Sequence, residues 1–226
     1  MRILIVNSNT TQAVTDMVAA EARRVSASDV EFDAVTAPFG PAGIETRAHA
    51  ATAAHATQEA FQARREGYDA GIVACFVDPG LMAAREVVPY PVVGIGEAAY
   101  LTACTLGSRF SILTLGNGLL QPIREEVARH GLLGRLASVH GLPVGVVAAA
   151  GDQAALLDPM RLLIDRAVND DGADVIVLGG AALAGLIPML GDAPVPLLDG
   201  VACAAGLARS LAAMNRSLKD RTQPDA

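Results

Sequence analysis

Short apolar runs rich in Val and Ile alternate along the chain with longer, Ala-rich segments, and this alternation constrains the fold most strongly. Most of the runs lack the polar alternation of a strand with one face in water, so we expect strands that helices cover on both faces. Strand–helix alternation predicts mostly parallel sheets with right-handed crossovers. The expected strands are Arg2–Val6, Glu31–Thr36, Ala70–Ala74, Val92–Ile95, Phe110–Leu115, Val144–Ala148, Asp174–Leu178 and Val195–Leu198.

Helices are expected between these strands. The first begins after Asn9 or Thr10, both of which are good helix caps. The expected helices are Thr10–Val25, Thr46–Arg65, Pro79–Val87, Glu97–Leu106, Leu120–His130, Asp152–Val168 and Gly200–Met214. The end of the chain, Leu218–Ala226, is polar and contains a proline, so we expect it to be disordered.

The chain also resembles two similar halves joined in sequence. Ile3–Asn9 parallels Ser111–Asn117, each being an apolar strand followed by a polar turn that ends in Asn. Asp69–Leu81 parallels Asp174–Leu186, each with an Asp, an apolar run, a turn and then Gly-Leu. Repeats of this kind predict two copies of one folding unit.

We therefore expect an α/β fold with two pseudo-symmetric lobes, each a mostly parallel sheet flanked by helices, and an active-site cleft between them. The register of the repeat places Cys75 opposite Gly180. Ligands of open α/β sheets bind at the carboxyl ends of the strands, so both turns should line the cleft. The expected division is a first lobe of residues 1–97 plus 200–217, a second lobe of residues 98–199 and a disordered tail of residues 218–226.

Composition and charge narrow the classes of function. The 226 residues include 17 Lys and Arg against 24 Asp and Glu, and a net charge of −7 argues against a nucleic-acid partner. Although 52% of the residues are hydrophobic, no uninterrupted apolar run approaches the roughly 18 residues of a membrane span. The run Ile3–Val6 is too short for a signal peptide. Three cysteines give no disulfide framework, which favours a cytoplasmic protein. The apolar excess favours a homo-oligomer.

Cys75 is the first candidate for chemistry. It ends an apolar strand shortly before Asp78 and Pro79, which suit the cap and the first turn of a helix. The thiol would then lie beside a helix N-terminus, whose N–H groups lower a thiol pKa. Most free cysteines are simply small buried hydrophobes. The position at a strand end and the sharp turn favour a reactive thiolate.

Three other segments follow strands and can line a site. Asn7–Thr11 can hold a carboxylate or carbonyl oxygen at a helix start, or it can be a simple helix cap; it lacks the Gly-rich pattern and Lys of a phosphate loop. Gly40–Thr46 can be a lid, a substrate wall or an ordinary connector. Val93–Ala98 brings two glycines to a strand end, where the backbone can approach another group closely, and Glu97 fits the first turn of a helix.

Together these motifs resemble the Asp/Glu/hydantoin racemase superfamily, and most closely its hydantoin and allantoin racemase branch. The resemblance extends from Arg2 to Leu211. Its most specific string is Cys75–Leu81, whereas Asn7–Thr11 departs from the family by having Ser8 where Pro is usual. The resemblance implies two pseudo-symmetric α/β lobes with the site between them, which agrees with the internal repeat.

The resemblance also implies cofactor-independent chemistry with two cysteines. One removes the proton next to a carbonyl as a thiolate, and the other delivers a proton to the opposite face. Cys75 matches the first position, whereas Gly180 stands at the second. A racemase that works in both directions needs an acid/base group on each face. Cys104 or Cys203 is a hypothesis for the second group, although each is more simply interpreted as a buried structural thiol within a helix.

Three functions stay open at this point. The first is a racemase or epimerase of a hydantoin, allantoin or amino-acid-like substrate whose second base is unusual, such as a water or a polar side chain. The second is a one-cysteine decarboxylase or isomerase, by analogy with arylmalonate decarboxylases, whose single cysteine occupies the other turn. The third is a non-catalytic protein that binds a small molecule in the same cleft. No cluster of His, Cys and Asp has metal-ligand spacing, so we expect no metal and no cofactor.

The expected site has two catalytic positions, Cys75 and Gly180. An enolate-like oxygen would meet backbone N–H groups after these residues and the turn at Asn9 and Thr10. Thr114, which matches Val6 in the repeat, can add a hydroxyl. The expected substrate-binding residues are Asn9, Thr10, Ile44, Phe76, Val77, Thr114, Gly179 and Ala181.

Overall fold

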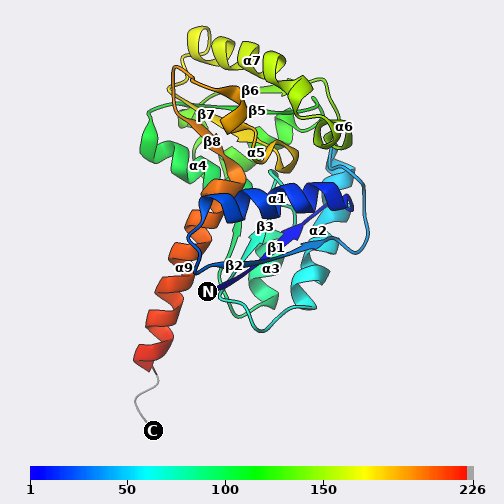
Figure 1. Ribbon diagram of the computed structural model, residues 1–226, viewed down its shortest axis with the longest axis vertical. Helices are drawn as coiled ribbons and strands as arrows, with labels where there is room; N and C mark the ends of the chain where they lie inside the picture. The colour runs from blue at the N-terminus through cyan, green and yellow to red at the C-terminus, as the bar shows by residue number, and fades with distance from the viewer. Residues whose placement is uncertain (223–226) are drawn as a thin grey trace.

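The computed structural model describes residues 1–222, with side chains described as far as residue 216, and contains two four-stranded sheets (Figure 1). The strand orders are β2-β1-β3-β4 and β6-β5-β7-β8, so the second sheet repeats the order of the first. Every pair of neighbouring strands is parallel. The expected α/β fold with two pseudo-symmetric lobes is confirmed.

The first sheet consists of β1 (Arg2–Asn7), β2 (Glu31–Thr36), β3 (Ala70–Val73) and β4 (Val92–Gly94), and the second of β5 (Phe110–Leu115), β6 (Leu136–Leu142), β7 (Val175–Gly179) and β8 (Leu197–Asp199). The α-helices are α1 (Gln12–Val25), α2 (Arg47–Gln62), α3 (Leu81–Val87), α4 (Ile95–Leu106), α5 (Leu120–Arg129), α6 (Val146–Gly151), α7 (Leu157–Asn169), α8 (Ile187–Leu190) and α9 (Gly200–Thr222). Short 3-10 helices are η1 (Leu133–Arg135), η2 (Ala154–Leu156) and η3 (Ala181–Leu183).

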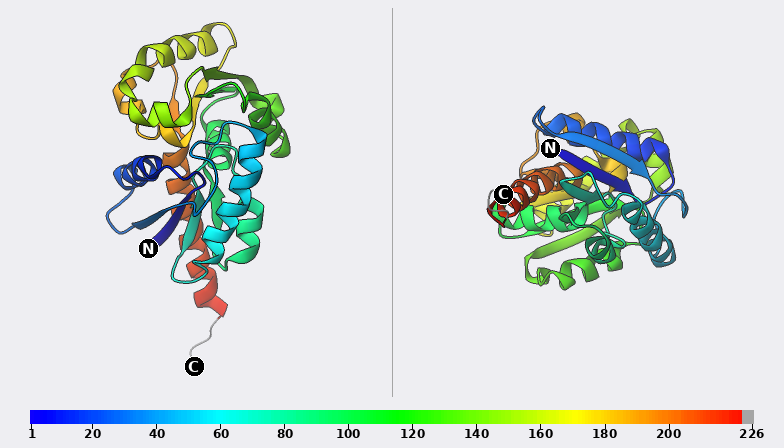
Figure 2. Two further views of the ribbon diagram at one scale, coloured as in Figure 1. Left: turned by 90° about the vertical axis from the view of Figure 1, so that its right-hand side faces the viewer. Right: turned by 90° about the horizontal axis from the view of Figure 1, so that it is seen from below.

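The central strands β3, β5 and β7 are buried along their whole length, because helices cover both faces of each sheet. In the first lobe, α1 and α9 lie on one face and α2 and α3 on the other (Figure 2). Ring contacts cross from one lobe to the other, with ring centroids 5.4 Å apart for Phe76 and Tyr100 and 6.2 Å for Tyr100 and Phe110. The two lobes therefore share one continuous apolar core.

Two helices connect the lobes by packing across them. Helix α4 follows β4 but also packs against β7 of the second sheet, and α9 follows β8 but packs against β3 and β4 of the first. The two helices also pack against each other, and Figure 1 shows α9 running from the second lobe along the first. The predicted lobe boundaries, 1–97 plus 200–217 and 98–199, stay a prediction.

One predicted strand is wrong. Val144–Ala148 is not a strand; it leads into α6, and the strand of this region is β6. Because β6 is an edge strand, only part of it is buried, and its sequence lacks the apolar run that marks the other strands. The N–H of Val146 in the first turn of α6 donates to Glu45 Oε1 of the other lobe at 2.8 Å, a contact that the local sequence does not reveal.

Two helix predictions also need correction. The helix expected at Pro79 begins only at Leu81, because Gly80 adopts a left-handed conformation with φ of 77° and forms the N-cap. Helix α9 continues to Thr222, so residues 218–222 of the expected disordered tail are helical, and residues 223–226 lie outside the described residues. Across the described part of the chain, the helices are too short or too polar to cross a membrane.

Candidate functional site

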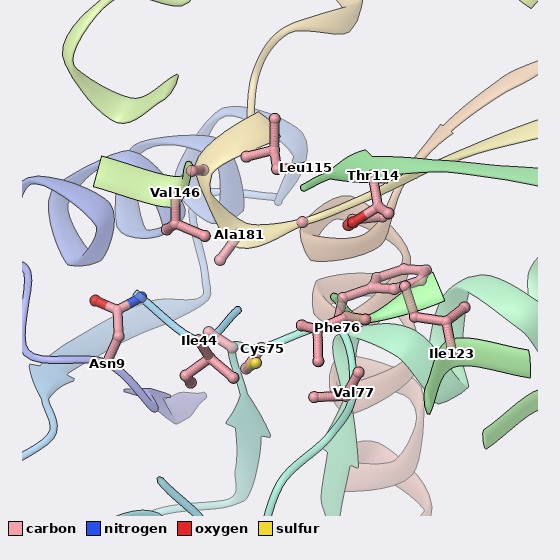
Figure 3. Close-up of a pocket in the computed structure, with 15 residues that line it drawn as sticks. Asn9, Ile44, Cys75, Phe76, Val77, Thr114, Leu115, Ile123, Val146 and Ala181 are labelled. Carbon is pink, nitrogen blue, oxygen red and sulfur yellow. The ribbon is translucent and has the colours of Figure 1, made fainter. Parts of the chain in front are cut away.

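A cavity lies between the lobes, at the carboxyl ends of β3, β5 and β7 (Figure 3). This is the edge at which parallel sheets bind ligands. Side chains of both lobes form its wall. The lining residues are Asn9, Ile44, Ala74, Cys75, Phe76, Val77, Thr114, Leu115, Leu119, Ile123, Val146, Gly179, Gly180, Ala181 and Ala182.

The structure brings together all the predicted site residues except Thr10. Thr10 donates its backbone N–H to Pro41 O at 3.1 Å and does not line the cavity. Six further residues line the cavity without having been predicted from the sequence: Ala74, Leu115, Leu119, Ile123, Val146 and Ala182. The spacing of Leu119 and Ile123, one helical turn apart, was an available signal. Val146 was missed because its segment was interpreted as a strand.

Burial dominates the chemistry of Cys75. Loss of solvent raises the pKa of the Cys75 thiol to about 12, and the charge of Asp78 adds to the increase. Hydrogen bonds from the backbone N–H groups of Val77 and Phe76 oppose it. The prediction of a thiol acidified by a helix N-terminus is wrong for this conformation, because α3 begins only at Leu81.

The raised pKa predicts the pH dependence of any reaction that would need the Cys75 thiolate. Below the thiol pKa, the fraction of Cys75 present as thiolate grows about tenfold per pH unit. The value of kcat/KM depends on the protonation state of the free enzyme, so it should grow with that fraction. We expect kcat/KM to rise with pH past the ordinary thiol pKa of about 8.5, without a plateau up to pH values where the fold persists. Initial rates at each pH, corrected for the protein-free reaction and checked against circular dichroism, measure this. A plateau near neutral pH would contradict it.

The side chain of Asn9 is held in one orientation. Its Oδ1 accepts the backbone N–H of Thr11 at 2.9 Å and Nδ2 of Asn7 at 3.0 Å. Since these donors require an oxygen acceptor, Asn9 Nδ2 must point the other way, and Figure 3 shows it directed into the cavity. The residue is only 3% exposed, and Nδ2 has no acceptor among the described residues. An uncharged hydrogen-bond donor is therefore directed into a cavity whose lining is mostly apolar.

Gly179 and Gly180, two adjacent glycines of the second lobe, differ in whether the surrounding structure leaves room for a side chain. A Cβ on Gly179 would lie 2.7 Å from Phe76 Cε1 and 2.8 Å from Ile112 Cγ2, so no larger residue fits. Gly180 has φ of 179°, which any residue adopts, and a Cβ there would meet nothing nearer than Leu183 at 3.6 Å. Position 180 can therefore carry a side chain, and backbone geometry does not require its absence.

Carboxyl groups, a half-buried one on Asp78 and a buried one on Asp199, fix both cavity turns to the helices that follow the fourth strands. Asp78 accepts the backbone N–H groups of Gly96 (3.1 Å) and Glu97 (2.7 Å) in the first turn of α4. In the second lobe, Asp199 accepts Gly185 N–H of the cavity turn at 2.8 Å and Val201 N–H of α9 at 2.7 Å. In each lobe, one carboxyl group therefore connects a turn to a helix. In the first lobe it is Asp78 of the turn itself, and in the second lobe it is Asp199 at the end of β8.

Burial raises the pKa of both carboxyl groups against the effect of these hydrogen bonds. The pKa of Asp199 rises to about 6, and that of Asp78 rises well above its usual range. Asp78 is also the one non-glycine residue of the described chain with positive φ, at 44°. The turn after Cys75 is therefore held in a conformation that depends on the capping contact with α4.

Cys75 is the one titratable side chain in the cavity lining. Cys104 and Cys203 lie in α4 and α9, outside that lining, so the hypothesis that either replaces the second cysteine is wrong. Their helices flank the sheets and carry both thiols away from the strand ends. The described residues contain no group of His, Cys, Asp and Glu side chains that would bind a metal.

Comparisons with known proteins show the family and the fold. Residues 3–208 match the family model described as Asp/Glu/hydantoin racemase. A hydantoin racemase of Paenarthrobacter aurescens is 38% identical over 217 residues, which cover 95% of this chain and 92% of that protein. The structure of allantoin racemase from Klebsiella pneumoniae matches with a TM-score of 0.91 and 35% identity, over 95% of this chain and 89% of that one. A structure of arylmalonate decarboxylase, with a TM-score of 0.63, 20% identity and coverage of 94% and 92%, shares the fold.

Proposed function

Because the chain belongs to the Asp/Glu/hydantoin racemase family, we propose that it is a cofactor-independent racemase or epimerase in which Cys75 is the acid/base. The substrate is a carbon acid whose acidic C–H lies next to a carbonyl. One observation supports this proposal most: Cys75 is the single titratable side chain lining a cavity that both lobes build. The backbone N–H groups of the two residues that follow Cys75 act to lower the pKa of its thiol, which suits a group that must carry charge during the reaction.

The proposed reaction begins with the Cys75 thiolate removing the proton next to the carbonyl. The electron pair of the C–H bond then moves to the carbonyl oxygen and forms an enolate. Asn9 Nδ2 is suited to stabilise that oxygen, because its orientation is fixed, it faces the cavity and it has no acceptor among the described residues. A hydrogen bond of this kind strengthens as negative charge develops, so it favours the transition state over the ground state.

The lining also favours one class among the candidate substrates. No Lys, Arg or other charged side chain lines the cavity, whereas Ile44, Phe76 and Val77 supply apolar surface. Burying a carboxylate without a positive partner is costly. A neutral cyclic ureide with an apolar substituent, such as a 5-substituted hydantoin, therefore fits this cavity better than an acidic amino acid.

The substrate class can be tested by following optical rotation with enantiopure 5-benzylhydantoin, allantoin and L-aspartate. We expect kcat/KM for the benzylhydantoin to exceed that for aspartate by at least about 100-fold, which corresponds to a modest 2.7 kcal/mol of unpaired carboxylate burial. Protein-free samples give the spontaneous rate. A kcat/KM for L-aspartate that exceeds the value for 5-benzylhydantoin would contradict the assignment of a neutral substrate.

A second candidate is a decarboxylase or isomerase that transfers a proton on one face only. The observation in its favour is Gly180, which leaves the face opposite Cys75 without a side chain. Release of CO₂ from an arylmalonate, with no loss of rotation from any hydantoin, would favour this function. A protein that only binds would show ligand-induced stabilisation and no turnover. The three unpaired cysteines and the apolar composition support a cytoplasmic homo-oligomer as part of the proposal.

A further inference from the structure

We propose that a water molecule bound beside Gly180 is the proton donor on the face opposite Cys75. This inference rests on the proposed function and supplies its missing second group. Three features of the cavity carry it: the symmetry of the two turns, the space at position 180 and the polar groups around that space.

The symmetry of the two turns places hydrogen-bond donors beside Gly180. The repeat pairs Cys75 with Gly180 and Gly80 with Gly185, and both Gly80 and Gly185 have φ of 77°. The turns also share a backbone hydrogen bond, from Asp78 N–H to Cys75 O at 2.9 Å and from Leu183 N–H to Gly180 O at 3.0 Å, although Asp78 has a positive φ and its counterpart Leu183 does not. In the first lobe, the backbone N–H groups of the two residues after Cys75 act to lower the pKa of its thiol. The equivalent N–H groups of the second lobe should face the place where a second sulfur would lie.

Those equivalent donors belong to Ala181 and Ala182. They are the first two residues of η3, and the first N–H groups of a helix have no partner within it. No acceptor for either N–H group occurs among the described residues. Both residues line the cavity. Two backbone donors are therefore available to one oxygen atom at this position.

The space beside Gly180 suits a water molecule. The nearest atoms to a Cβ built there are Leu183 Cδ1 at 3.6 Å and Leu115 Cδ1 at 4.0 Å, so no neighbour fills the place of a side chain. A bound water also needs two to four polar partners.

Thr114 can supply a third partner from the same wall. Its hydroxyl donates to Gly179 O at 2.5 Å, which commits the hydrogen and leaves lone pairs on Oγ1 to accept from the water. The water would then receive two N–H donors and give one hydrogen to Thr114. Its second hydrogen stays available for the substrate carbon. This arrangement holds a proton donor opposite the Cys75 thiol.

The proton transfers balance as follows. The Cys75 thiolate takes the α-proton, and the C–H electron pair moves through the C–C bond to the carbonyl oxygen. The enolate carbon then takes a proton from the bound water on the opposite face, which leaves hydroxide stabilised by the Ala181 and Ala182 N–H groups. The hydroxide recovers a proton from the Cys75 thiol through solvent. The thiolate and the water are regenerated, and the substrate carbon is inverted.

The test compares racemisation with α-proton exchange in D₂O, using enantiopure 5-benzylhydantoin with polarimetry and proton NMR on the same samples. In Gly180→Ala, a methyl group takes the place of the water without a steric clash. We expect the ratio of racemisation to exchange to fall by at least about tenfold, because a positioned proton donor contributes roughly 10²–10⁴-fold. In Gly180→Cys, a thiol replaces the water, and the ratio should rise to or above the wild-type value.

Gly134→Ala is the control, since a methyl group there enters open space away from the cavity, and its ratio should equal that of the wild type. Circular dichroism verifies that each variant is folded. A wild-type ratio retained in Gly180→Ala overturns the water proposal. Exchange with retained configuration in the wild type also overturns it, while leaving Cys75 as the base. Absence of both exchange and racemisation in the wild type contradicts the proposed function together with the inference.

Discussion

Replacing Cys75 with alanine is expected to lower kcat/KM for racemisation by at least about 1,000-fold, within the range of a lost general acid/base. The effect should be this large because no second titratable side chain lines the cavity to take over the proton transfer. Cys75→Ser tests the same point with little change of volume, since a hydroxyl is far less acidic than a thiol, and it should be almost as inactive. Polarimetry with enantiopure 5-benzylhydantoin measures both variants.

Cys104→Ala is the matched control for this experiment. Cys104 is a partly buried cysteine in α4 that lies outside the cavity, so its loss should leave kcat/KM within about twofold of wild type, as for most substitutions remote from a site. The control separates a specific role of Cys75 from a general effect of losing a thiol. A Cys75→Ala variant that keeps a tenth or more of the wild-type kcat/KM would rule out the thiolate mechanism.

Gly94→Ala is expected to destabilise the fold by at least about 3 kcal/mol, because it combines overpacking with the loss of two buried hydrogen bonds. A Cβ on Gly94 would lie 2.1 Å from Asp78 Cγ, inside the carboxyl group that caps α4. Moving that carboxyl away leaves the N–H groups of Gly96 and Glu97 unpaired. Urea unfolding measures the loss as a lower transition midpoint with an unchanged slope.

Two further variants control this prediction. Gly180→Ala adds the same methyl group in the turn after β7, where the nearest atom is 3.6 Å away, and should change stability by less than about 1 kcal/mol. In the double variant Asp78→Gly with Gly94→Ala the clash is absent, so its loss should be smaller than the sum of the two single losses. Strictly additive losses would show that the methyl group and the carboxyl group do not compete for one place.

The parts of this structure that follow local sequence patterns could be predicted. The buried strands β3, β5 and β7 are unbroken apolar runs, which is what helices on both faces require. The repeat paired Cys75 with Gly180 because both turns keep a glycine at the same offset, and the structure gives Gly80 and Gly185 the same φ of 77°. A positive φ favours glycine strongly enough to leave a visible mark in the sequence.

Features that depend on contacts between residues far apart in the sequence could not be predicted. The conformation of Val144–Ala148 involves Glu45, which is remote in sequence and caps α6 from the other lobe. Asp78 looked like the cap of its own helix but caps α4 instead. The pKa of Cys75 depends on how completely both lobes exclude water, whereas the sequence suggested only nearby N–H groups. In each case a long-range contact overrides the local pattern.

The central claim is that Cys75 removes the proton next to a carbonyl inside this cavity. Its most direct test follows the α-proton of enantiopure 5-benzylhydantoin by NMR in D₂O, with wild type, Cys75→Ala and protein-free samples side by side. We predict that the wild type replaces the α-proton with deuterium at a rate that rises with pH, and that Cys75→Ala exchanges no faster than the protein-free sample. An α-proton signal that persists with the wild type, or exchange that continues unchanged in Cys75→Ala, would contradict the claim.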